Sequence, residues 1–225
     1  MKKALLICGL VLGFMASFSV FGEPIRISIL GDSYSTFKDC IPKGNACWYP
    51  RLHRNDVKKA EECWWHLAIT ALGGKLEKNE SWSGSTICFT GYKGVNASKS
   101  SFVTRSSRLG NPDLILICGA TNDSWANSPI GEYKWTGWTE KDLFSFRPAM
   151  AKMLYDIKKQ YPNAKVFFVL NSDLKPIINE SVHTVCKYYN VPCVDLKNIN
   201  KQSGHPSAAG MKAMADQVVE AVKNN

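Results

Sequence analysis

Short runs of apolar residues divide the chain, and segments with a helical spacing of apolar positions lie between them. The runs 114–117 and 166–169 are continuously apolar rather than alternating. Such runs are typical of strands that are covered on both faces of a parallel sheet. The five strands predicted from this pattern are residues 25–30, 75–79, 114–118, 165–170 and 192–196.

The segments between the strands predict helices. Apolar positions recur at helical spacing over residues 57–72, with Asp56 placed to cap this helix and Gly73 to end it. Three further helices are predicted over residues 140–160, 176–189 and 206–222. This alternation predicts an α/β fold: a three-layer α/β/α sandwich around a five-stranded parallel sheet. We see no internal repeat and no linker-like composition, so residues 23–225 are expected to form one domain.

The first 22 residues have a different character. Lys2 and Lys3 precede an apolar stretch over residues 4–21, and small residues including Gly22 follow. This pattern is typical of a secretory signal peptide, here residues 1–22. A transmembrane anchor is the alternative interpretation, although the stretch is at the short end of spanning length. We expect a secreted or periplasmic protein with no stable membrane insertion after cleavage.

The distribution of charged residues indicates whether a nucleic-acid partner is to be expected. The chain has 28 basic and 19 acidic side chains, a formal net charge of +9, to which Lys2 and Lys3 contribute two. The remaining charges are scattered and favour solvated faces over a nucleic-acid groove, so no nucleic-acid partner is expected.

Cysteine spacing bears on metals and redox state. Seven of the eight cysteines lie outside the leader, and Cys40 and Cys47 flank a turn region where they could pair in an oxidising compartment. No C-x-x-C motif is present, which argues against a zinc ribbon or a thioredoxin-type site. The sequence implies no metal and no organic cofactor.

Three connections are longer than crossovers require: residues 37–55, 81–100 and 124–139. Each follows a strand, so all three should emerge at the carboxyl edge of the sheet, where open α/β folds bind ligands. They are rich in aromatic residues, which could form either a small apolar cluster under the loops or a wall for sugar rings or acyl chains. The candidate substrate-binding residues are Trp48, Trp82 and Trp125.

Four short motifs lie in the junctions between predicted strands and helices: Gly-Asp-Ser-Tyr-Ser at 31–35, Asn-Glu-Ser-Trp-Ser-Gly at 79–84, Gly-Ala-Thr-Asn-Asp at 119–123 and, just before the last helix, Gly-His-Pro at 204–206. The first places Ser33 at the start of a helical turn, where free N–H groups favour an oxyanion. The backbone N–H of Gly84 can approach a bound oxygen closely, and the amide of Asn122 can donate to the same oxygen. Pro206 suits the first position of the last helix.

These motifs, in this order, resemble those of the SGNH (GDSL-type) hydrolase family over nearly the whole mature chain. The resemblance implies a flavodoxin-like SGNH hydrolase fold and serine esterase activity. It also implies that Ser33 is the nucleophile and His205 the general base. The oxyanion hole would consist of the N–H groups of Ser33 and Gly84 and the side chain of Asn122.

The topology supports this interpretation on its own. In a flavodoxin-like strand order the first and third strands are neighbours at the topological switch point. Ser33 and Asn122 would then face each other across the crevice, with Gly84 beside them. A serine hydroxyl needs such donors and a base within hydrogen-bond reach.

One position departs from the family pattern. An aspartate usually stands three residues before the histidine, and here that position holds Gln202. Three possibilities stay open: a Ser-His dyad with Gln202 or a backbone carbonyl as the orienting group, a contribution from another acid such as Asp195, or weak or absent catalysis. The remaining histidines are His53 in a loop and His66 and His183 within helices, where structural roles are expected.

The sequence therefore predicts an esterase that removes short acyl groups, most simply acetyl, from a small-molecule or glycan ester. A lipase or lysophospholipase on the same scaffold is the nearest alternative. The other alternative is a carbohydrate-binding protein derived from a hydrolase, for which Gln202 is the main argument.

Overall fold

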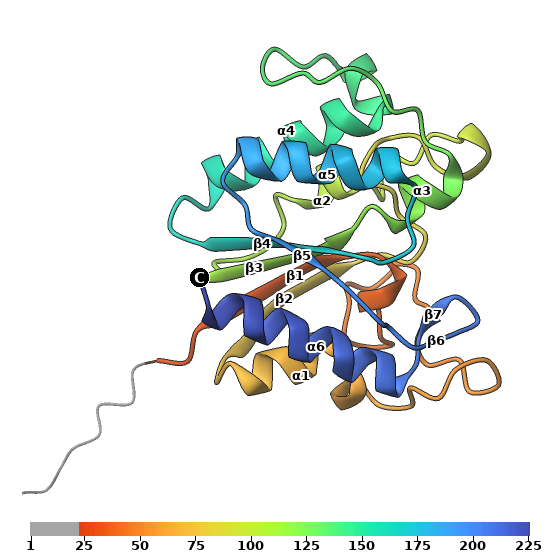
Figure 1. Cartoon of the computed structure of the whole chain (residues 1–225), viewed down its shortest axis with the longest axis vertical. Helices are drawn as coiled ribbons and strands as arrows, with labels where there is room; N and C mark the ends of the chain where they lie inside the picture. Colours follow the sequence, from red (N-terminus) through yellow and green to blue (C-terminus); the bar gives the residue numbers. More distant parts are fainter. Residues whose placement is uncertain (1–22) are drawn as a thin grey trace, which may run out of the picture.

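A five-stranded parallel sheet forms the centre of the protein (Figure 1). The structure is a computed structural model that describes residues 23–225, so the predicted signal peptide lies outside the described residues. The strand order is β2-β1-β3-β4-β5, the flavodoxin-like order, as predicted. The strands are β1 (Arg26–Gly31), β2 (Lys75–Ser81), β3 (Leu114–Gly119), β4 (Lys165–Leu170) and β5 (Cys193–Asp195).

Helices cover both faces of this sheet. One layer holds α1 (Trp64–Ala71) and α6 (Ala208–Lys223), and the other holds α4 (Phe146–Gln160) and α5 (Pro176–Tyr188), below and above the sheet in Figure 1. Shorter elements are α2 (Phe102–Arg105), α3 (Thr121–Ala126), and the 3-10 helices η1 (Ser33–Ser35), η2 (Ala60–Glu62), η3 (Tyr92–Gly94) and η4 (Glu140–Phe144). A hairpin of β6 (Lys201–Gln202) and β7 (His205–Pro206) precedes α6. The predicted three-layer sandwich is confirmed.

The central strand shows why its sequence is apolar throughout. All six residues of β3 are buried. Ile115 and Ile117 join the core under α4 and α5, whereas Leu116 joins the core over α1 and α6. Successive side chains of a strand point to opposite faces, so a strand between two helical layers needs apolar residues at every position.

The first predicted helix is shorter than its apolar spacing suggested. The structure has the single turn η2 before α1, and Cys63 rather than Asp56 is the N-cap residue of α1. The carboxylate of Glu62 accepts hydrogen bonds from the N–H groups of Lys58 and Lys59, which stabilises a turn there. Asp56 instead accepts a hydrogen bond from the N–H of Ala208, the first residue of α6, at 2.8 Å.

Two other predicted helix boundaries are wrong. The segment 140–160 forms η4 and then α4, because Ser145 between them has an extended backbone. The last helix begins at Ala208, since Pro206 belongs to the strand β7 and Ser207 is the N-cap residue. Pro206 is therefore not the first helical residue.

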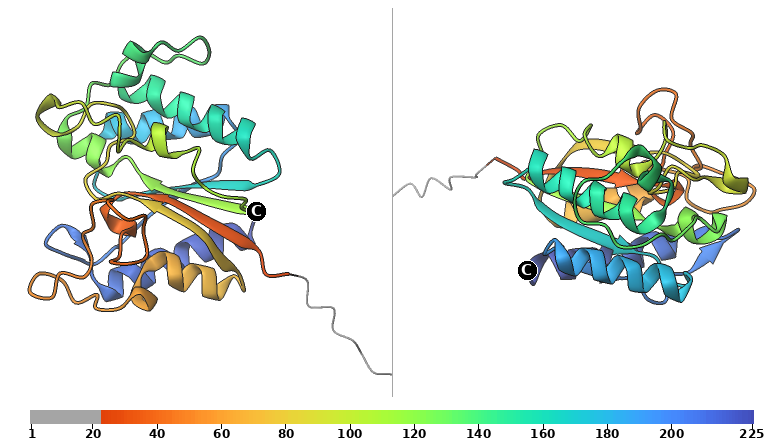
Figure 2. Two further views of the ribbon diagram at one scale, coloured as in Figure 1. Left: turned by 180° about the vertical axis from the view of Figure 1, so that it is seen from behind. Right: turned by 90° about the horizontal axis from the view of Figure 1, so that it is seen from above.

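The two ends of the sheet have different roles. The start of β1 and the C-terminus lie together at one end, and the long loops and the β6–β7 hairpin gather at the other (Figures 1 and 2). Within residues 23–225, no helix is both long enough and apolar enough to span a bilayer. The seven cysteines of this part are free thiols, so Cys40 and Cys47, whose spacing would allow a disulfide, are not paired.

Replacing Phe168 by Ala tests the two-sided core. This side chain is fully buried in β4, between β3 and β5, and its loss should lower the free energy of unfolding by about 3–5 kcal/mol. Denaturant unfolding measures the change. Leu52→Ala is the control, since Leu52 is 64% exposed and should change stability by no more than about 0.5 kcal/mol. Equal effects of the two substitutions would contradict the assigned core.

Candidate active site

Ser33 lies at the carboxyl end of β1, as its position in the sequence predicts. It begins the turn η1, and Asp32 caps that turn by accepting a hydrogen bond from the N–H of Tyr34 at 3.0 Å. Gly31 is needed for a close approach: a Cβ there would lie 2.5 Å from Cβ of Ser35. The buried backbone around Ser33 thus leaves no room for a larger residue before the cap.

The hairpin β6–β7 carries His205. Its two central residues, Ser203 and Gly204, both have positive φ, at 51° and 75°, as two-residue hairpin turns of type I′ require. Buried side chains hold the strand of this hairpin that carries the histidine. Tyr34 donates a hydrogen bond to the carbonyl of Gly204 at 2.8 Å. The carbonyl of Pro206 accepts two more, from Tyr49 Oη at 2.8 Å and Asn55 Nδ2 at 3.0 Å.

One hydrogen bond joins Ser33, which follows β1, to His205 in the hairpin before α6. Ser33 Oγ lies 2.9 Å from Nε2 of His205, and Nδ1 of the same ring lies 3.1 Å from the carbonyl oxygen of Ser203. Burial lowers the pKa of His205 to about 4; the hydrogen bond with Ser203 opposes this shift, and the charge of Arg51 adds to it. The imidazole is therefore neutral near pH 7. With the Nδ1 proton donated to Ser203, Nε2 is free to accept the proton of Ser33.

The hydrogen-bond partner of His205 Nδ1 is the backbone carbonyl of Ser203 and not Gln202. The side-chain oxygen of Gln202 accepts a hydrogen bond from the N–H of Asp56 at 2.9 Å. Asp195 does not approach His205 either, because it ends β5 and pairs with His183 at 3.1 Å. Of the partners for the His205 ring that the sequence left open, the structure shows the backbone carbonyl.

Asn122 lies in the first turn of α3, directly after β3. Its Nδ2 donates one hydrogen bond to the carbonyl of Ser85 at 3.0 Å, and its Oδ1 accepts one from Tyr92 Oη at 2.7 Å. These contacts fix which way the amide points and leave the second N–H of Nδ2 available. Gly84 is exposed on the adjacent loop with φ of 80°, a value that L side chains rarely adopt.

A buried guanidinium holds the loop that carries Gly84. Arg105 in α2 is fully buried and donates hydrogen bonds to the carbonyls of Gly31, Glu80 and Ser100 and to Oγ of Ser85. Burial lowers the pKa of Arg105 to about 9. The contacts tie the ends of β1 and β2 to one side chain.

The buried carboxyl groups of Asp32 and Asp123 also hold the segments around the site in place. Burial raises the pKa of Asp32 to about 7 and that of Asp123 to about 6. Asp123 accepts hydrogen bonds from the N–H groups of Ile87 and Cys88, at 2.8 and 3.2 Å. It thereby fastens the second long loop to α3.

The three candidate tryptophans have different surroundings. Trp48 stacks on the ring of His205, with centroids 3.7 Å apart and planes 9° apart, so this face contacts the imidazole rather than a substrate. Trp125 lies edge-on to the same imidazole at 6.2 Å and is 42% exposed. Trp82 is half-buried, and its backbone N–H donates to the carbonyl of Gly31.

The remaining histidines lie outside this group. His53 is exposed, and His66 packs against Trp65. His183 was expected among apolar residues, but it is exposed and paired with Asp195. Sequence reasoning did not single out Tyr92 or Arg105, because no motif marks a side chain that supports a site from another loop.

A serine hydroxyl beside a neutral imidazole, at the carboxyl edge of a parallel sheet, is the arrangement of a serine hydrolase. The chain belongs to the GDSL-like lipase/acylhydrolase family, whose profile matches residues 25–222. Members of this family hydrolyse ester bonds. No curated protein matches the sequence.

Solved structures agree with this assignment. The chain is 47% identical to a candidate GDSL-like lipase from Bacteroides ovatus, with a TM-score of 0.89, covering 91% of this chain and 100% of that one. A second candidate GDSL-like lipase, from Bacteroides uniformis, is 46% identical with a TM-score of 0.88 and coverage of 90% and 97%. An acetyl xylan esterase from Butyrivibrio proteoclasticus shares the fold at 17% identity, with a TM-score of 0.58 and coverage of 90% and 64%.

The depressed pKa of His205 predicts how hydrolysis depends on pH. Only the neutral imidazole can accept the proton of Ser33, and protonation sets in as the pH falls toward the folded-state pKa of about 4. The value of kcat/KM for nitrophenyl acetate should therefore stay level between about pH 7 and 5 and fall to half near pH 4. Circular dichroism at each pH controls for unfolding. An acidic limb near pH 6.5, the value of an unperturbed histidine, would contradict the buried neutral ring.

Tyr92→Phe tests the orientation of Asn122. The substitution removes the hydrogen bond from Tyr92 Oη to Asn122 Oδ1. Such a bond contributes about 0.5–1.5 kcal/mol, so kcat should fall about 2- to 10-fold with little change in KM. Tyr155→Phe, on the outer surface of α4, is the matched control. A change confined to KM would indicate that the hydroxyl of Tyr92 contacts substrate and does not orient Asn122.

Proposed function

We propose that this protein is an exported serine esterase that removes short acyl groups, acetyl above all, from carbohydrate. The observation that carries the proposal is the 2.9 Å contact between Ser33 Oγ and a neutral His205. Export follows from the pattern of residues 1–22, and the carbohydrate follows from the aromatic rim of the site.

In the acylation step, Ser33 Oγ attacks the ester carbonyl carbon while its proton passes to Nε2 of His205. The carbonyl oxygen becomes an oxyanion that accepts hydrogen bonds from the N–H groups of Ser33 and Gly84 and from the second N–H of Asn122 Nδ2. The intermediate then collapses: the bond to the sugar oxygen breaks, and that oxygen takes the proton from Nε2. The sugar leaves as an alcohol, and the acyl group stays on Ser33.

Water completes the cycle. His205 takes a proton from a water molecule, whose oxygen attacks the acyl carbon, and the proton returns to Ser33 Oγ as the acid leaves. The imidazolium that forms in each half has no carboxylate beside it. Its Nδ1 proton is held by the carbonyl of Ser203, and the face of Trp48 lies against the ring. A cation next to an aromatic face is stabilised by about 0.5–2 kcal/mol, so the stacked tryptophan partly compensates for the missing acid.

The rim of the site favours a sugar. Trp125 is 42% exposed and Tyr92 is 41% exposed, and both contact residues of the proposed machinery, His205 and Asn122. Aromatic side chains offer a flat apolar face together with a polar edge, and this combination suits the apolar face and hydroxyl groups of a sugar ring. The shared fold with an acetyl xylan esterase is consistent with such a substrate.

Hydrolysis of a series of nitrophenyl esters, from acetate to decanoate, tests the proposal. We expect Ser33-dependent turnover that is highest on acetate. Ser33→Ala and His205→Ala should each lower kcat by about 10⁴-fold or more, and by similar factors, because the two residues act as a unit. Acetylated oligosaccharides then test the carbohydrate directly.

The other outcomes separate the alternatives. A maximum at long acyl chains would identify a lipase or lysophospholipase. If no ester is turned over in a Ser33-dependent way, the protein is better explained as a carbohydrate-binding derivative of a hydrolase, and oligosaccharide binding becomes the decisive measurement.

A further inference from the structure

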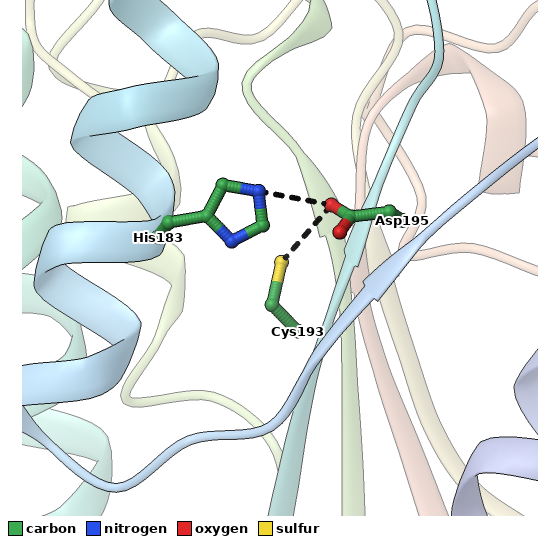
Figure 3. Close-up of side chains that lie close together, drawn as sticks. All are labelled: His183, Cys193 and Asp195. Atoms are coloured by element: carbon green, nitrogen blue, oxygen red, sulfur yellow. Dashed lines mark hydrogen bonds and ion pairs between the residues drawn. The ribbon is translucent and has the colours of Figure 1, made fainter.

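A second group of reactive side chains lies on the edge strand β5, away from Ser33. The helix α5 contributes His183 and Cys186, which are one turn apart, and β5 contributes Cys193 and Asp195, two residues apart. Positions i and i+3 share a face of a helix, and positions i and i+2 share a face of a strand. Figure 3 shows the side chains of His183, Cys193 and Asp195 converging between the two elements.

The distances among these side chains are short. His183 Nε2 lies 3.1 Å from Asp195 Oδ1, and Cys193 Sγ lies 3.8 Å from the same oxygen. One donor atom from each of the three residues lies within 4.8 Å of the others. The thiol of Cys186 lies beside Cys193 on the buried side, but it is not one of the three donor atoms that converge.

The distances from Asp195 Oδ1 to His183 Nε2 and Cys193 Sγ are close to those between neighbouring ligand atoms around a metal ion. Bonds of about 2.0–2.3 Å from a tetrahedral zinc ion to nitrogen, oxygen and sulfur place neighbouring ligand atoms about 3.3–3.8 Å apart. A set of one imidazole, one carboxylate and one thiolate is also chemically selective, because soft sulfur ligands favour Zn²⁺ over Mg²⁺ or Ca²⁺.

We propose that His183, Cys193 and Asp195 form a binding site for Zn²⁺ or a similar borderline divalent cation. The ion replaces the thiol proton of Cys193 and the direct contact between His183 and Asp195, so that Nε2 and Oδ1 both coordinate it. No electron transfer is involved, and each displaced proton goes to solvent.

The place in the fold gives such an ion a structural role. β5 is an edge strand that pairs only with β4, through three residue pairs. A bound ion would link β5 directly to α5. The site lies three strands away from β1 and Ser33 in the sheet order, so the ion would stabilise the fold without taking part in ester hydrolysis. Ligand binding to the folded state alone raises stability in proportion to the logarithm of its concentration.

Metal titration of the whole protein, reduced with a phosphine and freed of metal with a chelator, tests this proposal. We expect one Zn²⁺ per chain and a higher melting temperature on binding. Co²⁺ used as a probe should give the near-ultraviolet absorption band of a thiolate–metal bond. Cys193→Ser should abolish that band. Losing a partner outside the coordination shell weakens metal binding by about 10- to 100-fold, and Cys193→Ser should weaken Zn²⁺ binding by more than this.

His183→Ala provides a second variant, and because His183 is exposed, its replacement should leave the fold intact. It should weaken Zn²⁺ binding comparably, whereas His53→Ala, at an exposed histidine outside the group, should bind as the parent does. Three results would overturn the proposal: no stoichiometric Zn²⁺, undiminished binding by Cys193→Ser, or a disulfide between Cys186 and Cys193 in protein isolated without reductant.

Discussion

The hydrogen bond between Ser33 Oγ and His205 Nε2 joins residues that are 172 positions apart in the chain. It forms only when the turn after β1 and the hairpin before α6 are held at the same edge of the sheet. Tyr34 and Tyr49 provide much of that hold, since Tyr34 in η1 and Tyr49 in the first long loop each donate a hydrogen bond to a carbonyl of the hairpin. The parallel sheet and its buried phenols thus set the distance on which any proton transfer from Ser33 depends.

Electrostatics at this bond follow from burial rather than from an acid. A histidine that is nearly buried and has no carboxylate beside it stays neutral, as the lowered pKa of His205 indicates. The carbonyl of Ser203 selects the tautomer with the proton on Nδ1. Gln202 does not substitute for the acid, because the hairpin directs its side chain to the backbone of Asp56. A backbone carbonyl supplies orientation and a partial negative charge, and Trp48 adds the electron-rich face of an indole.

Buried polar groups under the loops explain how three separate connections form one site. Arg105 connects the ends of β1 and β2, and Asp123 connects the second loop to the helix of Asn122. Each group loses hydration on burial and recovers hydrogen bonds from backbone atoms of another segment. Such groups favour one loop arrangement over others, because a displaced loop would leave them unpaired in the interior.

The sequence by itself determined the layers of the fold, the positions of Ser33, Gly84 and Asn122 after strands and that of His205 before the last helix, because apolar periodicity and short motifs are local signals. It also indicated the hydrolase family, and that resemblance implied the strand order. It could not determine the ends of the first helix, the partner of Gln202, the stacking of Trp48 on the imidazole, or the supporting roles of Tyr92 and Arg105. Those depend on which side chains meet across loops distant in sequence, and only the tertiary structure decides that, since a contact of this kind leaves no periodicity in the chain.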